Sequence, residues 1–244
     1  MLISKKHKYV FLCNEKCASN SIEEMLKPYS EIALVGLQTV RHTNFTDYDR
    51  YIKPYLKVRA KVDNLETICV VREPLSWLNS WYRFRSRSTL RNRDHPNHHK
   101  STFGMKFSEF ITAYMSPEPP AFVKDLGSQF NFVEDSMGEV GVDTIFLYED
   151  LDSLVNYMSH RVDRNLKLKN INVSPKKATL KKLYKLNFPW NSHKQINGAN
   201  SESRSTIKKY EISEDLLSSL HKFIHKDFEL YETLKKSPQP FHSS

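Results

Sequence analysis

The sequence predicts a three-layer α/β fold, in which a mostly parallel central sheet is covered by helices on both faces. Short apolar runs rich in β-branched residues alternate with amphipathic segments along the chain, the pattern typical of such folds. The run at residues 67–71 (TICVV) is continuous, as a buried parallel strand requires. The 244 residues can bury a sizeable core, and we expect one domain over 1–244.

The first predicted unit is a strand, a short loop and a helix. Residues 8–13 (KYVFLC) form the strand. Residues 19–26 form the helix, and Pro28 ends it because proline cannot continue a helix. A second strand is expected at 31–35, and the clearest strand of the chain at 67–71.

The later elements continue this alternation. A helix is predicted over 75–85, a further strand over 143–148, and a single long amphipathic helix over 214–234. Residues 86–104 are polar, and residues 163–210 are rich in Lys, Asn and Ser. We expect both stretches to be long loops, and loops of this length are usually functional or mobile.

Composition narrows the classes of function. Lys and Arg number 37 and Asp and Glu 28, and the resulting charge of +9 favours anionic partners. Three cysteines without a Cys-x-x-Cys pair argue against a disulfide framework or a structural zinc site, and we expect no metal. The six glycines form neither Gly-x-Gly-x-x-Gly nor a Walker A loop. No apolar run reaches the roughly 20 residues of a membrane helix or resembles a signal-peptide core, so we expect a cytoplasmic protein.

Two strand-to-helix loops carry side chains suited to an anion. The first, CNEKCASNSI over 13–22, places a lysine and small polar residues at a helix start. The second, VREPLSWLNS over 71–80, begins with Arg72, and Ser76 and Ser80 lie four residues apart on one helix face. Ligands bind at the carboxyl ends of parallel strands, where arginine and hydroxyl groups can hold a phosphate. Each loop alone is equally compatible with an ordinary helix cap and solvated charges.

Together and in this order, the loops resemble those of sulfotransferases that use 3′-phosphoadenosine 5′-phosphosulfate (PAPS). The segment KYVFL…KxASxS is similar to the 5′-phosphosulfate loop of carbohydrate-type and bacterial members, and VREPx5SxY is similar to their 3′-phosphate motif. YEDL at 148–151 and DFELY at 227–231 resemble further short motifs, whereas 86–104 and 163–195 have no counterpart. The resemblance implies the P-loop-NTPase-like sulfotransferase fold.

The resemblance also implies roles for individual residues. Lys16 would bind the 5′-phosphosulfate and stabilise the leaving phosphate oxygen. Arg72 and Ser80 would hold the 3′-phosphate, which distinguishes PAPS from ATP. The family commonly has Gly and Thr at the positions of Ser19 and Asn20. Further cofactor contacts would come from Cys17, Ala18, Ser19, Asn20 and Ser21 and, by rough position alone, from Arg204 and Lys208.

Sulfuryl transfer to a hydroxyl needs a base. His42 follows the second predicted strand, where similar bacterial proteins carry a histidine, and its ordinary pKa suits the task. Glu15 is the rival base. The implied acceptor is a carbohydrate or another polar small molecule, possibly anionic, and 86–104 with 163–195 would form its side of the site.

Two other functions remain open on the residues alone. Glu149 or Asp150 could hold Mg²⁺ in a nucleotide kinase. The arginines over Arg83–Arg93, interleaved with aromatic residues, could bind nucleic acid, although the tryptophans of that helix fall on its inward face. Cys17 lies beside a lysine at a helix N-terminus, which predicts a lowered thiol pKa.

Overall fold

The computed structural model describes residues 1–169, 209–237 and 241–242. The strand order of its sheet is β3 (Ile32–Ala33), β1 (Leu2–Ser4), β2 (Tyr9–Phe11), β4 (Glu66–Val71), β5 (Thr144–Leu147) and β6 (Phe241–His242). The central strands β2, β4 and β5 are parallel, whereas β1 is antiparallel to both its neighbours and β6 is antiparallel to β5. Four of the six strands therefore run in the same direction, as the predicted α/β fold requires.

The four predicted strands form, and β1 and β6 are additions. The strand β1 extends the sheet beside β2. It pairs with β2 across a tight turn in which Lys8 has a φ of 51°. A strand of three residues is too short to show the period-2 pattern on which sequence prediction depends. This hairpin places two antiparallel pairings at one side of the sheet.

Two clusters of apolar side chains cover opposite faces of the sheet. Alternate residues of a strand point to opposite faces, and in β4 Ile68 and Val70 belong to one cluster, Cys69 and Val71 to the other. Helices α1 (Ser19–Leu26) and α8 (Leu151–Val162) contribute to the first cluster. Helices α3 (Phe45–Asp47) and α11 (His225–Lys236) contribute to the second, so the architecture has three layers.

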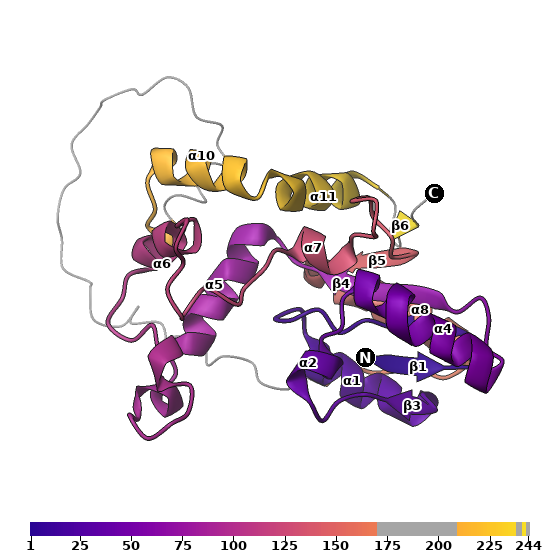
Figure 1. Cartoon of the computed structure of the whole chain (residues 1–244). Helices are drawn as coiled ribbons and strands as arrows, with labels where there is room; N and C mark the ends of the chain where they lie inside the picture. Colours follow the sequence, from indigo (N-terminus) through magenta and orange to yellow (C-terminus); the bar gives the residue numbers. More distant parts are fainter. Residues whose placement is uncertain (170–208, 238–240, 243–244) are drawn as a thin grey trace, which may run out of the picture.

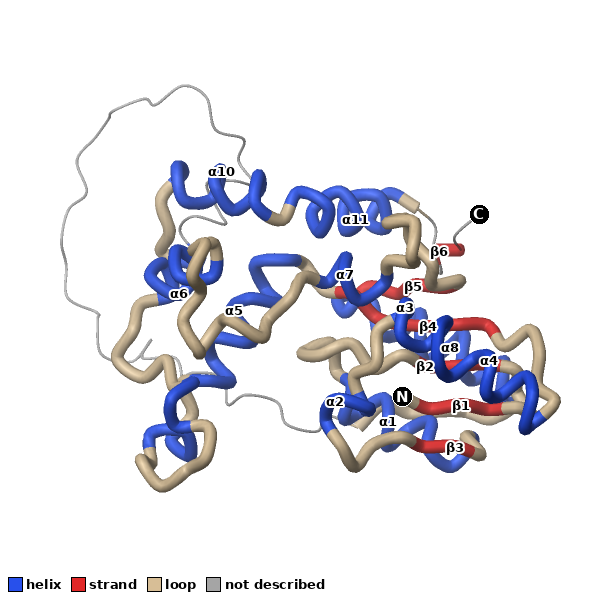
Figure 2. The backbone as a smooth tube through the Cα atoms, viewed as in Figure 1, coloured by secondary structure: helices blue, strands red, loops and turns tan. Residues whose placement is uncertain are grey.

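Helix α5 (Pro74–Arg85) begins directly after β4, as predicted, and leads the chain away from the sheet towards α6 (Phe107–Tyr114) (Figure 1). The single helix expected over 214–234 is instead two helices, α10 (Glu214–Phe223) and α11. They meet at Ile224, whose φ of −118° and ψ of 44° interrupt the helix while its side chain is buried. Figure 2 shows α5, α6 and α10 lying to one side of the six strands.

Residues 86–104, expected to be a long exposed loop, are tied to α5. They contain two short helical turns, Ser88–Arg91 and His98–Lys100, and Thr102 Oγ1 donates to the Tyr82 carbonyl at 2.9 Å. Of the second expected loop, residues 170–208 lie outside the described residues, and Arg204 and Lys208 with them. In the described ranges, no helix combines the length and apolar character needed to cross a bilayer.

Candidate active site

A cleft of about 860 Å³ opens where the loops that follow β2 and β4 meet. The structure brings together most of the predicted site residues on its walls, since both loops end at the same edge of the sheet. Part of the stretch 86–104 forms the far side. The predicted site residues that line the cleft are Lys16, Ala18, Ser19, Asn20, Ser21, His42, Arg72 and Ser80.

The loop after β2 has a strained backbone. Lys16 and Ala18 both have a φ of 61°, in the left-handed region that non-glycine residues rarely adopt. Two hydrogen bonds hold this conformation: Ser19 Oγ donates to the Asn14 carbonyl at 2.5 Å, and Asn14 Nδ2 donates to the Val70 carbonyl at 3.1 Å. The second bond connects the loop to Val70 of β4, so the sheet helps to hold Lys16 and Ala18 in the left-handed conformation.

Lys16 places a poorly solvated ammonium in the cleft. Its Nζ lies 4.2 Å from the Phe84 ring centroid and 5.5 Å from that of Trp81. Burial, followed by the charges of Arg87 and Arg72, lowers the pKa of Lys16 to about 8. Within the described part of the chain, no carboxylate forms an ion pair with this group. The Lys16 ammonium is therefore largely removed from water without an ion pair to a described carboxylate, which favours the binding of an anionic ligand.

Arg72, by contrast, is held by three contacts. Its Nε donates to Ser76 Oγ at 2.8 Å, and its Nη1 donates to the Lys16 carbonyl at 3.2 Å. Its Cζ lies 4.1 Å from the Tyr148 ring centroid. The guanidinium thus links the two loops and presents its remaining donors in a fixed orientation.

Two buried polar residues, Gln129 and Asp227, hold the backbone of Arg72 in place through hydrogen bonds. Gln129 accepts from the Arg72 N–H at 2.8 Å and donates to the Arg72 carbonyl at 2.7 Å. The Asp227 carboxylate accepts from the N–H groups of Gln129 and Phe130, at 3.0 and 2.9 Å, at the start of α7 (Gln129–Val133). Sequence reasoning missed Gln129, because nothing near it marks a single glutamine as special, and noted Asp227 only within its motif.

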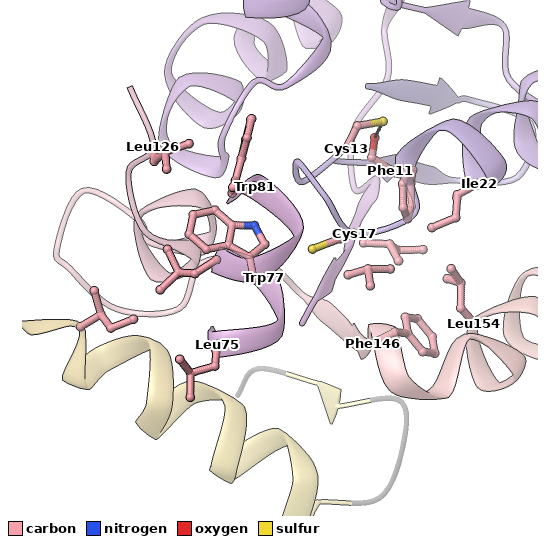
Figure 3. Close-up of a cluster of buried hydrophobic side chains, with 14 of the residues drawn as sticks. Phe11, Cys13, Cys17, Ile22, Leu75, Trp77, Trp81, Leu126, Phe146 and Leu154 are labelled. Atoms are coloured by element: carbon pink, nitrogen blue, oxygen red, sulfur yellow. Dashed lines mark hydrogen bonds between the residues drawn. The ribbon is translucent and has the colours of Figure 1, made fainter. Parts of the chain in front are cut away.

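The expected lowering of the Cys17 pKa is wrong. Cys17 is 1 % exposed, and its Sγ donates to Gln129 Oε1 at 3.6 Å. Burial raises the pKa of this thiol well above its ordinary value and outweighs the opposing charges of Arg72 and Lys16. The Cys17 side chain belongs to the core, beside Trp77 in Figure 3.

His42 lines the cleft, and the backbone holds one of its ring nitrogens. It follows α2 (Gln38–Arg41), and its Nδ1 lies 2.6 Å from the Cys13 carbonyl. A carbonyl only accepts, so Nδ1 carries the proton and Nε2 of the neutral ring keeps a free lone pair. Nε2 lies 3.9 Å from Glu15 Oε1. Burial lowers the pKa of His42 and raises that of Glu15.

The far wall of the cleft combines cations with one carboxylate. Arg85 and Lys100 both donate to Asp125 at 2.7 Å. The Phe84 ring carries a second cation besides Lys16, because the Arg87 Cζ lies 4.7 Å from its centroid. Arg87 and Lys100 of this wall belong to the stretch 86–104.

The structure offers little support for the two alternative functions, nucleic-acid binding and a nucleotide kinase. Trp77 and Trp81 are 4 % and 6 % exposed, so too little of either ring face is open for a base to stack on it. Asp150 caps α8, accepting from Ser153 Oγ at 2.6 Å, which occupies a carboxylate that a kinase would need for Mg²⁺. Among the described residues, no cluster of His, Cys, Asp and Glu could hold a metal ion.

One comparison with known proteins identifies a family. A model of the sulfotransferase family matches residues 1–232 of the 244. No curated protein and no solved structure matches the chain. The family match includes both loops of the cleft, the strands that carry them, and α11 as far as residue 232. The chain therefore belongs to the sulfotransferase family and is a transferase.

Proposed function

We propose that this protein transfers the sulfuryl group of PAPS to a hydroxyl of a carbohydrate or another polar small molecule. One observation carries the proposal: two cations from neighbouring strand ends, Lys16 and Arg72, face one cleft, and neither pairs with a carboxylate of the described chain. Such a pair of sites suits a ligand with two separate anionic groups. We further propose a single domain of P-loop-NTPase-like topology and a cytoplasmic location.

The residues present fit the two ends of PAPS. Lys16 would bind the 5′-phosphosulfate at the start of α1, together with the backbone N–H of Ser19, whose hydroxyl is bonded to Asn14, and donors from Asn20 and Ser21. Arg72 and Ser80 would bind the 3′-phosphate. Since Arg72 is fixed before any ligand arrives, little conformational entropy is lost when it binds.

The chemistry asks the protein for alignment, charge stabilisation and one proton acceptor. In the reaction the acceptor oxygen bonds to sulfur as the bond from sulfur to the 5′-phosphate oxygen breaks, giving a sulfate ester and adenosine 3′,5′-bisphosphate (PAP). His42 Nε2 would take the hydroxyl proton, and Glu15 would stabilise the imidazolium that forms. Lys16 would stabilise the charge on the leaving phosphate oxygen. Burial lowers the pKa of His42, which favours the neutral ring that can accept a proton.

The acceptor side would be formed by 86–104 and by 163–195. The described part of that wall presents Arg87, His95 and Asn97 to the cleft. A polar acceptor, and one carrying negative charge, fits these side chains best. This composition supports a carbohydrate over an apolar alcohol.

A thermal melt with PAP tests the proposal. At a hundred times its dissociation constant a ligand adds about 2.7 kcal/mol, or roughly 5–10 °C for a chain of this size. We expect that shift with PAP, a much smaller one with AMP, and none for Arg72→Ala with PAP. Arg59→Ala, which removes an exposed arginine outside the cleft, should keep the full shift. Absence of any shift at millimolar PAP would overturn the assignment.

A further inference from the structure

Trp81, which lines the cleft, has a buried indole N–H that makes no hydrogen bond. The side chain is 6 % exposed and contributes to the cleft wall. Within the described residues its Nε1 is the only buried side-chain nitrogen or oxygen without a hydrogen-bond partner. Leaving such a donor unpaired is destabilising, so a native structure that keeps one calls for an explanation.

Trp77 shows that the same helix can satisfy an indole. It precedes Trp81 by about one turn of α5, and the two rings meet edge to face with centroids 6.3 Å apart (Figure 3). Trp77 Nε1 donates to the Glu15 carbonyl at 2.9 Å. Trp81 differs in that it lines the cleft. Its Nε1 is covered in this structure, so a ligand in the cleft can supply the missing acceptor once the indole shifts to expose that atom.

The neighbours of Trp81 locate that acceptor. The ring centroid lies 5.5 Å from Lys16 Nζ and 5.1 Å from Arg85 Cζ. Trp81 thus adjoins the lysine proposed to bind the phosphosulfate and the Arg85–Asp125 pair of the far wall. An indole N–H only donates, so its partner is an acceptor atom, and the acceptors of a phosphosulfate group are its oxygens. In the proposed reaction, the group at the boundary between donor and acceptor is the sulfuryl group.

We propose that the indole N–H of Trp81 donates a hydrogen bond to a sulfuryl oxygen of bound PAPS. This inference rests on the proposed function and adds a binding residue to it. PAP lacks the sulfuryl group and cannot receive this bond. Trp81 would therefore favour the substrate over the product and help to orient the sulfur towards the acceptor.

Trp81→Phe tests the contact because it removes the N–H and keeps an aromatic ring. Titration of PAPS without acceptor should give a dissociation constant raised about tenfold or more, as for a hydrogen bond to a charged group. The dissociation constant for PAP should change by less than about twofold. The matched control is Trp77→Phe, which loses a bond inside the protein: its melting temperature should fall, and its PAPS-to-PAP affinity ratio should stay that of the wild type.

A second measurement works on the unaltered protein. The chain has three tryptophans, and Trp81→Phe identifies the indole N–H resonance of Trp81 by its loss. That resonance should move downfield on addition of PAPS and remain in place with PAP.

The outcomes separate the two proposals. Equal weakening of PAPS and PAP by Trp81→Phe, or no weakening of either, would overturn the Trp81 contact alone. A wild-type protein that binds neither nucleotide would overturn the proposed function and this contact with it.

Discussion

The two loops of the cleft hold their cations in opposite ways. Arg72 is fixed by Ser76, by the Lys16 carbonyl and by the Tyr148 ring. The ammonium of Lys16 lies against aromatic rings, and burial together with the charges of Arg87 and Arg72 lowers its pKa to about 8. Arg72 is thus already oriented in the free protein, whereas the Lys16 ammonium is poorly solvated in the free protein and would be stabilised by a bound anion.

This difference indicates a division of labour. A fixed guanidinium binds a group whose charge does not change during the reaction, as the 3′-phosphate does not. A poorly solvated ammonium gains most where charge increases, because its attraction to an anion is stronger away from water. We therefore expect Arg72 to act mainly on binding and Lys16 mainly on the rate of transfer.

Replacement of Lys16 should give the largest effect. We expect Lys16→Ala to lower kcat about 100- to 1000-fold, the range typical of losing a group that stabilises developing charge, with a smaller change in KM for PAPS. The assay follows PAP released from PAPS, with water or a carbohydrate mixture as the acceptor. Lys124→Ala, at an exposed position outside the cleft, is the control. A raised KM at unchanged kcat would mean that Lys16, like Arg72, acts on binding and not on the rate of transfer.

The pH dependence of PAP binding should show a smaller effect from the same residue. Below pH 8 Lys16 is already charged, so its contribution to affinity is complete. Above pH 8 the free protein must take up a proton on binding, and affinity should fall, by about tenfold per pH unit at most.

Calorimetric titration between pH 7 and 9.5 measures this fall. Lys16→Arg should flatten the curve, because an arginine keeps its charge over that range. A wild-type affinity that stays constant up to pH 9.5 would contradict the shifted pKa of Lys16.

Prediction from sequence succeeded where the signal is local. The continuous run TICVV, the helix that starts at Pro74 and the two polar loops depend on neighbouring residues alone, and all of them form. Prediction failed at β1, because a strand of three residues is too short to show an alternating pattern. It also failed at Ile224, where the chain leaves the helical conformation although the amphipathic pattern of the sequence continues.

The hydrogen bonds and the burial that shape the site could not be predicted from the sequence. The bonds from Asp227 to Gln129 and from Gln129 to Arg72 join residues far apart in the chain. The Cys17 pKa was predicted in the wrong direction because sequence shows the neighbouring lysine and not the burial. The tautomer of His42 likewise depends on the Cys13 carbonyl, which only the folded chain brings close.

The smallest effect should come from loosening the fixed cation. Ser76→Ala removes the acceptor for Arg72 Nε and leaves the Lys16 carbonyl and the Tyr148 ring in place. The loss of one hydrogen bond of about 0.5–1 kcal/mol predicts a PAP affinity about threefold weaker. Affinity for AMP, which has no 3′-phosphate, should not change, and neither should PAP affinity in Ser219→Ala, an exposed serine of α10. Equal weakening for both nucleotides would mean that Ser76 supports the loop as a whole and not the orientation of Arg72.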